Sequence, residues 1–216
     1  MMTRPGFSAF AAGMIVTALV AGGCQVTRAG YATAPYQVLH RSGSVEIRSY
    51  PPLRLVETST DGDDFMRLFR YISKGNASET RIAMTTPVFM TDLGTTHGRM
   101  AFVLPEDLTT PPAPSEPGVE LRTTEANTVA VLRFRGGQQG PDGEAARKLT
   151  AWMAHEGIPA EGAPVFAYFD PPWIPGFLCR NEVMIRTTWP PPAVSPAPDA
   201  GQRPVASDVG RVADAR

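Results

Sequence analysis

Apolar and polar positions follow two different periods along the middle of this chain. In two stretches apolar residues recur every three or four positions, which is the period of an amphipathic helix. The first predicted helix covers residues 61–74, and its core-facing stripe is expected to consist of Phe65, Leu68, Phe69 and Ile72. The second covers residues 142–155, with an apolar face of Ala145, Leu149, Trp152 and Met153.

The remaining apolar segments are short and rich in β-branched or aromatic residues, which predicts strands. These segments cover residues 45–48, 53–57, 82–90, 100–104, 119–123, 129–134, 165–169 and 182–187. In chain order the predicted elements read ββαββ twice. We therefore expect an α+β domain in which antiparallel strands curve around two helices.

The first 23 residues have the pattern of a bacterial secretory signal peptide. Arg4 supplies positive charge, residues 7–23 are uncharged and mostly apolar or small, and Cys24 follows two glycines. A cysteine in this place resembles the lipobox of bacterial lipoproteins. We therefore expect an acyl chain on Cys24 and a lipid-anchored, periplasm-facing protein at the bacterial cell envelope. Two alternatives stay open, namely simple secretion and an uncleaved N-terminal helix that serves as the anchor.

Composition separates a folded domain from its flanks. Residues 24–35 are predicted to be a tether and residues 36–189 the domain, which is long enough for one hydrophobic core. Residues 190–216 hold six of the 22 prolines among Ala, Asp and Arg, without an apolar period. This composition predicts a disordered tail.

Charge and cysteine content exclude several classes of protein. The chain has 20 Lys and Arg against 21 Asp and Glu, a net charge of −1, which argues against a nucleic-acid partner. Its two cysteines cannot form a disulfide framework when one of them carries lipid. The other, Cys179, is predicted to be a buried and inert thiol.

Six segments of the domain resemble the SOUL heme-binding protein family, and they occur in the family's order and spacing. They are residues 65–72 (FMRLFRYI), 82–88 (IAMTTPV), 102–105 (FVLP), 111–114 (PPAP), 168–173 (YFDPPW) and 180–183 (RNEV). The resemblance implies a distorted antiparallel β-barrel flanked by two helices and built from two pseudo-duplicated ββαββ halves. It also implies non-covalent binding of heme or another porphyrin in an apolar cleft.

The resemblance places this cleft between the first helix and the loop before the last strand. The expected ligand-binding residues are Met66, Arg67, Phe69, Arg70, Trp173, Ile174 and Phe177. Arg67 or Arg70 would meet the propionates, and the prolines of the loop would lower the entropic cost of ordering it. The alternative is structural: Trp173 and Phe177 cap the end of the sheet, and Met66 covers the edge of the core.

An axial histidine is not expected at the position where some relatives carry one, because this chain has Ser49 there. Serine is not among the residues that commonly ligate heme iron. His40, His97 and His155 fit surface or structural roles better. We therefore expect no metal-ligating site and a tetrapyrrole that is held mainly by apolar packing.

The sequence shows no phosphate-binding glycine loop, no metal-ligand spacing and no order of residues typical of a catalytic triad. We therefore expect a non-enzymatic protein that binds heme or a related tetrapyrrole at the cell envelope. The alternative is an envelope module that binds another apolar small molecule, or a protein partner, on the same cleft.

Overall fold

The computed structural model describes residues 30–191, except residues 94, 96, 137–140 and 171–173. The helices in this part of the chain are α1 (Asp64–Ile72), α2 (Pro141–His155) and the 3-10 helix η1 (Gly176–Leu178). The strands are β1 (Ala32–Thr33), β2 (Gln37–Ser42), β3 (Val45–Tyr50), β4 (Arg54–Ser59), β5 (Thr85–Thr86), β6 (Val88–Thr91), β7 (Arg99–Val103), β8 (Glu120–Thr123), β9 (Asn127–Phe134), β10 (Glu161–Tyr168) and β11 (Asn181–Arg186).

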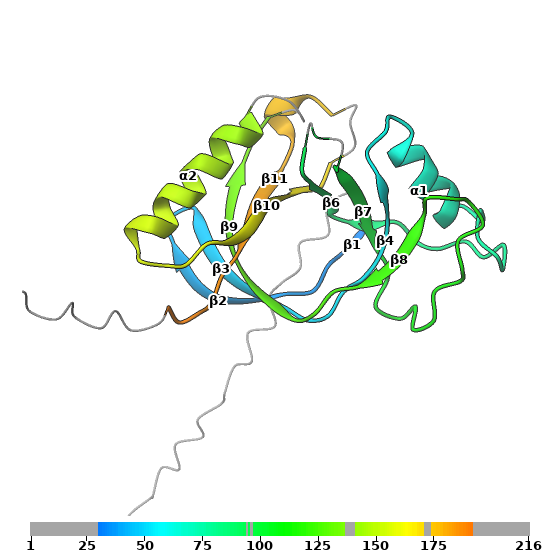
Figure 1. Ribbon diagram of the computed structural model, residues 1–216, viewed down its shortest axis with the longest axis horizontal. Helices are drawn as coiled ribbons and strands as arrows, with labels where there is room; N and C mark the ends of the chain where they lie inside the picture. Colours follow the sequence, from blue (N-terminus) through cyan, green and yellow to red (C-terminus); the bar gives the residue numbers. More distant parts are fainter. Residues whose placement is uncertain (1–29, 94, 96, 137–140, 171–173, 192–216) are drawn as a thin grey trace, which may run out of the picture.

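Nine of these strands form one antiparallel sheet in the order β2-β3-β9-β11-β10-β6-β7-β4-β8. Together with the two α-helices this confirms the predicted α+β class. Figure 1 shows that the sheet curves strongly, with α1 and α2 on its outer side. Within the described residues its end strands β2 and β8 are not paired with each other, so the barrel and the duplicated halves stay predictions.

Helix α2 covers the outer face of one half of the sheet, where it packs on β9 and β11. Its apolar face is the predicted one: Ala145, Leu149 and Met153 are buried and Trp152 is partly buried. The sheet contributes alternate residues, such as Ile47 of β3 and Val183 of β11, because successive side chains of a strand point to opposite faces.

Helix α1 covers the other half and packs on β4 and β7, but its buried stripe differs from the prediction. Leu68, Tyr71 and Ile72 are buried, whereas the exposed fraction of Phe69 is 42%. The prediction that Phe69 lies in the core is therefore wrong. The helix is rotated so that Tyr71 turns inward and donates a hydrogen bond to the Pro112 carbonyl oxygen at 2.8 Å, which leaves Phe69 stacked on Phe65 at the margin.

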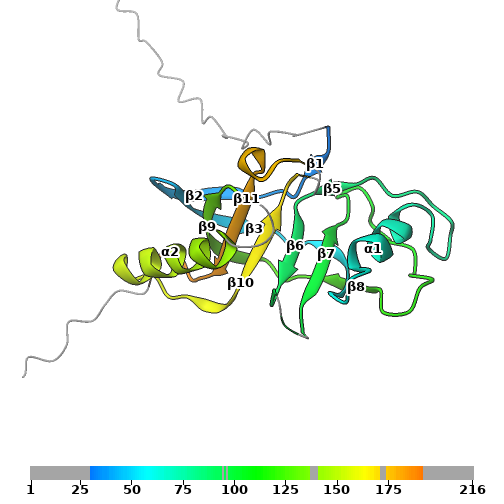
Figure 2. The same cartoon turned by 90° about the horizontal axis from the view of Figure 1, so that it is seen from above.

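A short N-terminal segment closes one end of the sheet's inner side. Strand β1 pairs with β5 in parallel, and the Ala34 N–H donates to the Thr86 carbonyl oxygen at 2.8 Å. Strand β1 and Ala34 lie within residues 24–35, the segment that was predicted to be a tether. In Figure 2, β1, β2 and η1 lie toward one edge of the molecule and the turn between β6 and β7 lies at the opposite edge. The inner side therefore has a covered end and an open end.

Both flanks that the sequence assigned to targeting and disorder, the signal peptide with Cys24 and the tail from residue 192, lie outside the described residues. No helix among the described residues is long and apolar enough to cross a membrane.

Candidate functional site

The open end of the sheet's inner side contains a cavity of about 640 Å³. Its volume lies in the range of roughly 300–1,000 Å³ that is usual for small-molecule sites. The surrounding strands and the residue just before β4 supply its apolar wall, which consists of Leu53, Leu55, Phe89, Ala101, Val129, Val165 and Met184. These residues come from both halves of the sheet, so the cavity exists only because the sheet bends back over itself.

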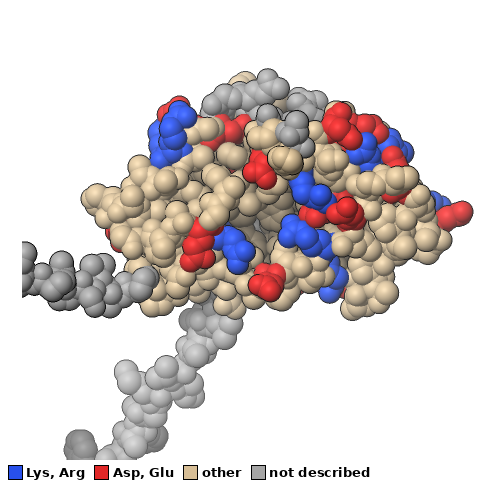
Figure 3. Space-filling model, in the orientation of Figure 1, with Lys and Arg blue, Asp and Glu red and all other residues tan. Residues whose placement is uncertain are grey.

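Charged side chains line the cavity in addition to this wall, and four of them form a linked cluster. Figure 3 shows the same face hollowed near its centre, with Arg or Lys and Asp or Glu atoms around the hollow. Glu57 accepts hydrogen bonds from Arg99 at 3.0 Å and from Arg122 at 2.9 Å. Arg99 also donates to Glu120 at 2.8 Å. We call these four residues the mouth cluster.

Two further charged residues line the cavity without joining this cluster. Arg186 and Glu125 make no ion pair within the described part of the chain. The Nε–H of Arg99 is buried and has no hydrogen-bond partner among the described residues. The cavity therefore has the guanidinium group of Arg186, and the exposed parts of Arg99 and Arg122, beside an apolar wall, an arrangement suited to an apolar molecule with an acidic group.

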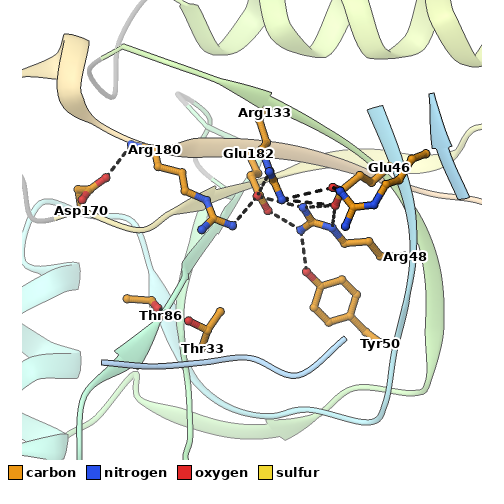
Figure 4. A network of polar contacts seen from close by, with 10 residues as sticks. Thr33, Glu46, Arg48, Tyr50, Thr86, Arg133, Asp170, Arg180 and Glu182 are labelled. Atoms are coloured by element: carbon orange, nitrogen blue, oxygen red, sulfur yellow. Dashed lines mark hydrogen bonds and ion pairs between the residues drawn. The ribbon is translucent and has the colours of Figure 1, made fainter. Parts of the chain in front are cut away.

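The covered end of the same inner side holds a second cluster of arginines and glutamates, shown in Figure 4. Glu182 is fully buried and accepts hydrogen bonds from Arg48 at 2.6 and 3.1 Å, from Arg180 at 2.9 Å and from Arg133 at 3.2 Å. Glu46 accepts from Arg48 as well, at 2.8 Å. We call these five residues the buried cluster, and its carboxylates have their acceptor sites occupied.

The buried cluster controls the charge states of its members. Burial alone would raise the pKa of Glu182, but the hydrogen bonds and charges of Arg48 and Arg180 outweigh it and lower this pKa. Burial opposes the charge of Arg48, yet its contacts with Glu182 raise its pKa above the ordinary value. Tyr50 receives a long hydrogen bond from Arg48, 3.4 Å, and its burial raises its pKa to about 12. Tyr50 also lines the cavity, so it offers a neutral phenol at neutral pH.

The two arginines expected to meet propionates are both engaged within the protein. Arg67 pairs with Asp61 at 3.0 Å and donates to the Thr58 hydroxyl at 2.9 Å. Arg70 pairs with Asp63 and with Glu116, each at 2.7 Å. Side-chain hydrogen bonds raise the pKa of both arginines, Arg67 through Asp61 and Arg70 mainly through Glu116. A ligand carboxylate would have to compete with these acids.

The apolar residues expected in the slot lie on two separate elements. Met66 and Phe69 are exposed on α1, with exposed fractions of 48% and 42%, and Phe177 on η1 is 70% exposed. Ile174 is half-buried, and Trp173 lies outside the described residues. Figures 1 and 2 both place β6 and β7 between α1 and η1. The cavity described above is lined by none of these residues, and the assignment of the ligand to them stays a prediction.

The histidines lie away from the cavity, and Ser49 faces away from it. His40 stacks on Trp189, His97 is exposed, and His155 is exposed beside Glu156. Ser49 follows Arg48 and precedes Tyr50 in β3, so its side chain points to the face opposite the cavity. Within the described residues no three His, Cys, Asp or Glu side chains are placed to hold a metal ion.

The residues of the cavity were not recognised from the sequence, although one signal was present. Each arginine and glutamate of the mouth cluster stands in a strand next to at least one apolar residue, such as Glu57 after Leu55 and Val56. A charged residue on the inward side of a strand needs a partner on a neighbouring strand. The pairing of strands far apart in sequence, β4 with both β7 and β8, supplies these partners and could not be read from one sequence.

The family model for the SOUL heme-binding protein matches residues 31–186 of the chain. No curated protein sequence matches this chain. Two protein structures from Listeria innocua resemble its fold: an uncharacterized conserved protein (11% identity, TM-score 0.53) and a hydrolase (11% identity, TM-score 0.51). Each similarity covers 67% of this chain and 92% of the other.

A third similar structure is EcmrR in a complex with DNA, with 13% identity and a TM-score of 0.51. This similarity covers 70% of the present chain but only 57% of EcmrR, so the chain spans little more than half of that protein. At such identities the three structures show a shared fold only.

Proposed function

Because the chain belongs to the SOUL heme-binding protein family, we propose that it binds heme or a related tetrapyrrole in the cavity at the open end of its sheet. The observation that carries this proposal is the cavity itself, about 640 Å³ with an apolar wall and guanidinium groups among its lining residues. A tetrapyrrole ring is a large apolar surface, and its carboxylates need cationic or hydrogen-bonding partners at the edge of the site.

The residues present fit the ring and its carboxylates better than they fit an iron atom. Among the described residues the lining contains neither His nor Cys, and its possible iron ligands are Met184, which is part of the buried wall, and Tyr50, which is a neutral phenol. Arg99, Arg122 and Arg186 can meet carboxylates. We therefore propose that apolar packing and these arginines hold the ligand, with the metal contributing little to affinity.

We propose a binding protein rather than an enzyme. The charged groups of the cavity are arginines and glutamates, and none of the threonine hydroxyls in its described lining hydrogen-bonds to a carboxylate or a histidine that could act as a base. Cys179 is buried, and its thiol contacts the Ile174 carbonyl oxygen at 3.4 Å. The alternative is that the same cavity serves another apolar small molecule or a segment of a protein partner.

The cell envelope is the proposed location, and it rests on the N-terminal sequence. A signal peptide followed by an acylated Cys24 would anchor the domain through the predicted tether, residues 24–35. Intact-mass measurement of protein extracted from membranes should show the loss of residues 1–23 and the added mass of acyl chains. A chain that retains Met1, or that is released without modification, would contradict this proposal.

A porphyrin titration of the domain tests the proposed site. Val165 is half-buried and lines the cavity, so Val165→Trp fills part of it with an indole ring. Met66→Trp adds the same ring to α1, at the slot predicted from the sequence, and is the matched control. We expect Val165→Trp to weaken protoporphyrin IX binding at least about tenfold, or 1.4 kcal/mol, and Met66→Trp to leave binding unchanged.

Thermal melts of both variants show whether each is folded. The reverse pattern, with Met66→Trp alone weakening the complex, would place the ring on α1 and reject the cavity. Wild-type protein that does not bind protoporphyrin IX or hemin would reject the proposed function itself.

A further inference from the structure

The two glutamates of the mouth cluster differ in their surroundings although both contact Arg99. Glu57 is 6% exposed and is held by two guanidinium groups, those of Arg99 and Arg122. Glu120 is 64% exposed and contacts Arg99 alone. Glu57 is therefore a fixed part of the wall, whereas Glu120 can leave Arg99 for water at little cost.

We infer that Glu120 occupies the place on Arg99 that a carboxylate of the ligand takes, and that the cavity thereby selects ligands with a free carboxylate over their esters. This inference rests on the proposed function of the cavity. It assigns to Glu120 the role of an internal counter-ion that is exchanged on binding, and to Glu57 the role of holding both arginines in place.

The charge balance of the cavity makes such an exchange necessary for an acidic ligand. Three arginines and three glutamates line it: Arg99, Arg122 and Arg186 with Glu57, Glu120 and Glu125. An anion that enters thus gains little from net charge, and it must form a specific contact with a guanidinium group. Displacing Glu120 frees Arg99 for that contact and moves one negative charge into solvent.

The energetics of the two contacts favour the exchange. An exposed ion pair contributes only about 0–1 kcal/mol because water competes and two long side chains must be ordered. A ligand carboxylate beside the apolar wall is shielded from water on one side and is already positioned by the ring. One guanidinium group can also donate two hydrogen bonds to a single carboxylate, and such paired hydrogen bonds are among the stronger ones.

Binding of an acid and its ester to charge variants tests the inference. Glu120→Gln removes the competing charge, and Glu125→Gln removes an equal charge from the same cavity at a residue with no ion pair. The probes are protoporphyrin IX and its dimethyl ester. We expect Glu120→Gln to tighten binding of the acid about three- to fivefold, the worth of one exposed ion pair, and to leave the ester unchanged. Glu125→Gln should tighten binding of the acid by less than half as much and should also leave the ester unchanged.

Three outcomes would overturn the inference. If Glu120→Gln and Glu125→Gln tighten the acid equally, net charge rather than exchange on Arg99 governs binding. If the acid and the ester respond alike to Glu120→Gln, the carboxylate is not recognised, although the proposed function survives. If neither probe binds the wild-type protein, the proposed function fails together with the inference.

Discussion

The inner side of the sheet carries two clusters of arginines and glutamates that differ in burial more than in composition. In the buried cluster Arg48 and Glu182 are both fully buried. In the mouth cluster Arg99 and Arg122 are 37% and 53% exposed, and only Glu57 is buried. The same residue types therefore serve two purposes: the covered cluster fixes the fold, and the open one remains able to exchange partners.

The N-terminal segment accounts for much of this difference. The aromatic ring of Tyr36 packs on the guanidinium group of Arg48, with 4.2 Å between the ring centre and Arg48 Cζ. Strand β1, which precedes Tyr36, pairs with β5. Arg48 and Glu182 are fully shielded from water at this end, which makes the loss of either partner costly. At the other end the sheet stays open and the cavity reaches solvent.

The largest expected effect of a single substitution is on stability at the covered end. Arg48→Met leaves Glu182 buried with fewer donors, and breaking a buried pair costs about 3–5 kcal/mol. Arg122→Met removes an exposed partner of Glu57 and should cost less than about 1 kcal/mol. Urea unfolding of both variants measures the difference. Equal losses of unfolding free energy would show that burial does not separate the two clusters.

Acidification should also lower the free energy of unfolding through the covered end, because the pKa of Glu182 is lowered in the folded protein. A carboxyl whose pKa is lower in the folded than in the unfolded state stabilises the fold above its unfolded pKa. That stability is lost as the pH falls below about 4.5, the ordinary value for a glutamate. Unfolding free energies measured between pH 7 and pH 3 should fall more steeply for wild type than for Glu182→Gln. If the unfolding free energies of the two proteins fall in parallel with pH, the ionised Glu182 does not stabilise the fold.

At the mouth the expected effect is on binding rather than on stability. Arg99→Met removes a charged donor to the ligand, and a hydrogen bond of this kind contributes about 1.5–3 kcal/mol, roughly a tenfold to hundredfold change in Kd. Its melting temperature should stay close to that of wild type, because the Arg99 side chain is 37% exposed. Normal binding of protoporphyrin IX by Arg99→Met would show that Arg99 does not contact the ligand.

The smallest effect is expected from the histidines. His40, His97 and His155 lie outside the cavity lining, so replacing each by Ala should leave hemin affinity within a few-fold. A loss of about 2.7 kcal/mol, two orders of magnitude in Kd, for any one of them would show that a histidine ligates the iron. The clusters would then orient a metal-bound ligand instead of holding it themselves.

Local patterns in the sequence were sufficient for most of the elements. The helical period located α1 and α2. The predicted apolar face of α2 was correct, since its Leu149 and Met153 are fully buried. The inward face of α1 was wrong at Phe69, since both a stripe with Phe69 and a stripe with Tyr71 satisfy the helical period. Contacts with distant residues such as Pro112 decide between them.

The edges of the fold and the candidate cavity depend on long-range pairing. β2 is mostly exposed, so its residues lack the apolar alternation that indicates a strand, and β1 has only two residues. The mouth cluster joins Glu57 to Arg99 and Arg122, which are separated from it by more than forty residues. Such contacts follow from the order of strands in the sheet, which one sequence does not reveal.

Methionine methyl NMR during a porphyrin titration tests the central claim most directly, because a porphyrin ring shifts the resonances of nearby methyl groups strongly. Met184 lies in the cavity wall, Met66 is exposed on α1, and Met153 on the buried face of α2 is an internal control. We predict a large shift for Met184, saturating at one equivalent of protoporphyrin IX, with Met66 and Met153 unchanged. A shift of Met66 with Met184 unmoved would contradict the account and place the ligand on α1.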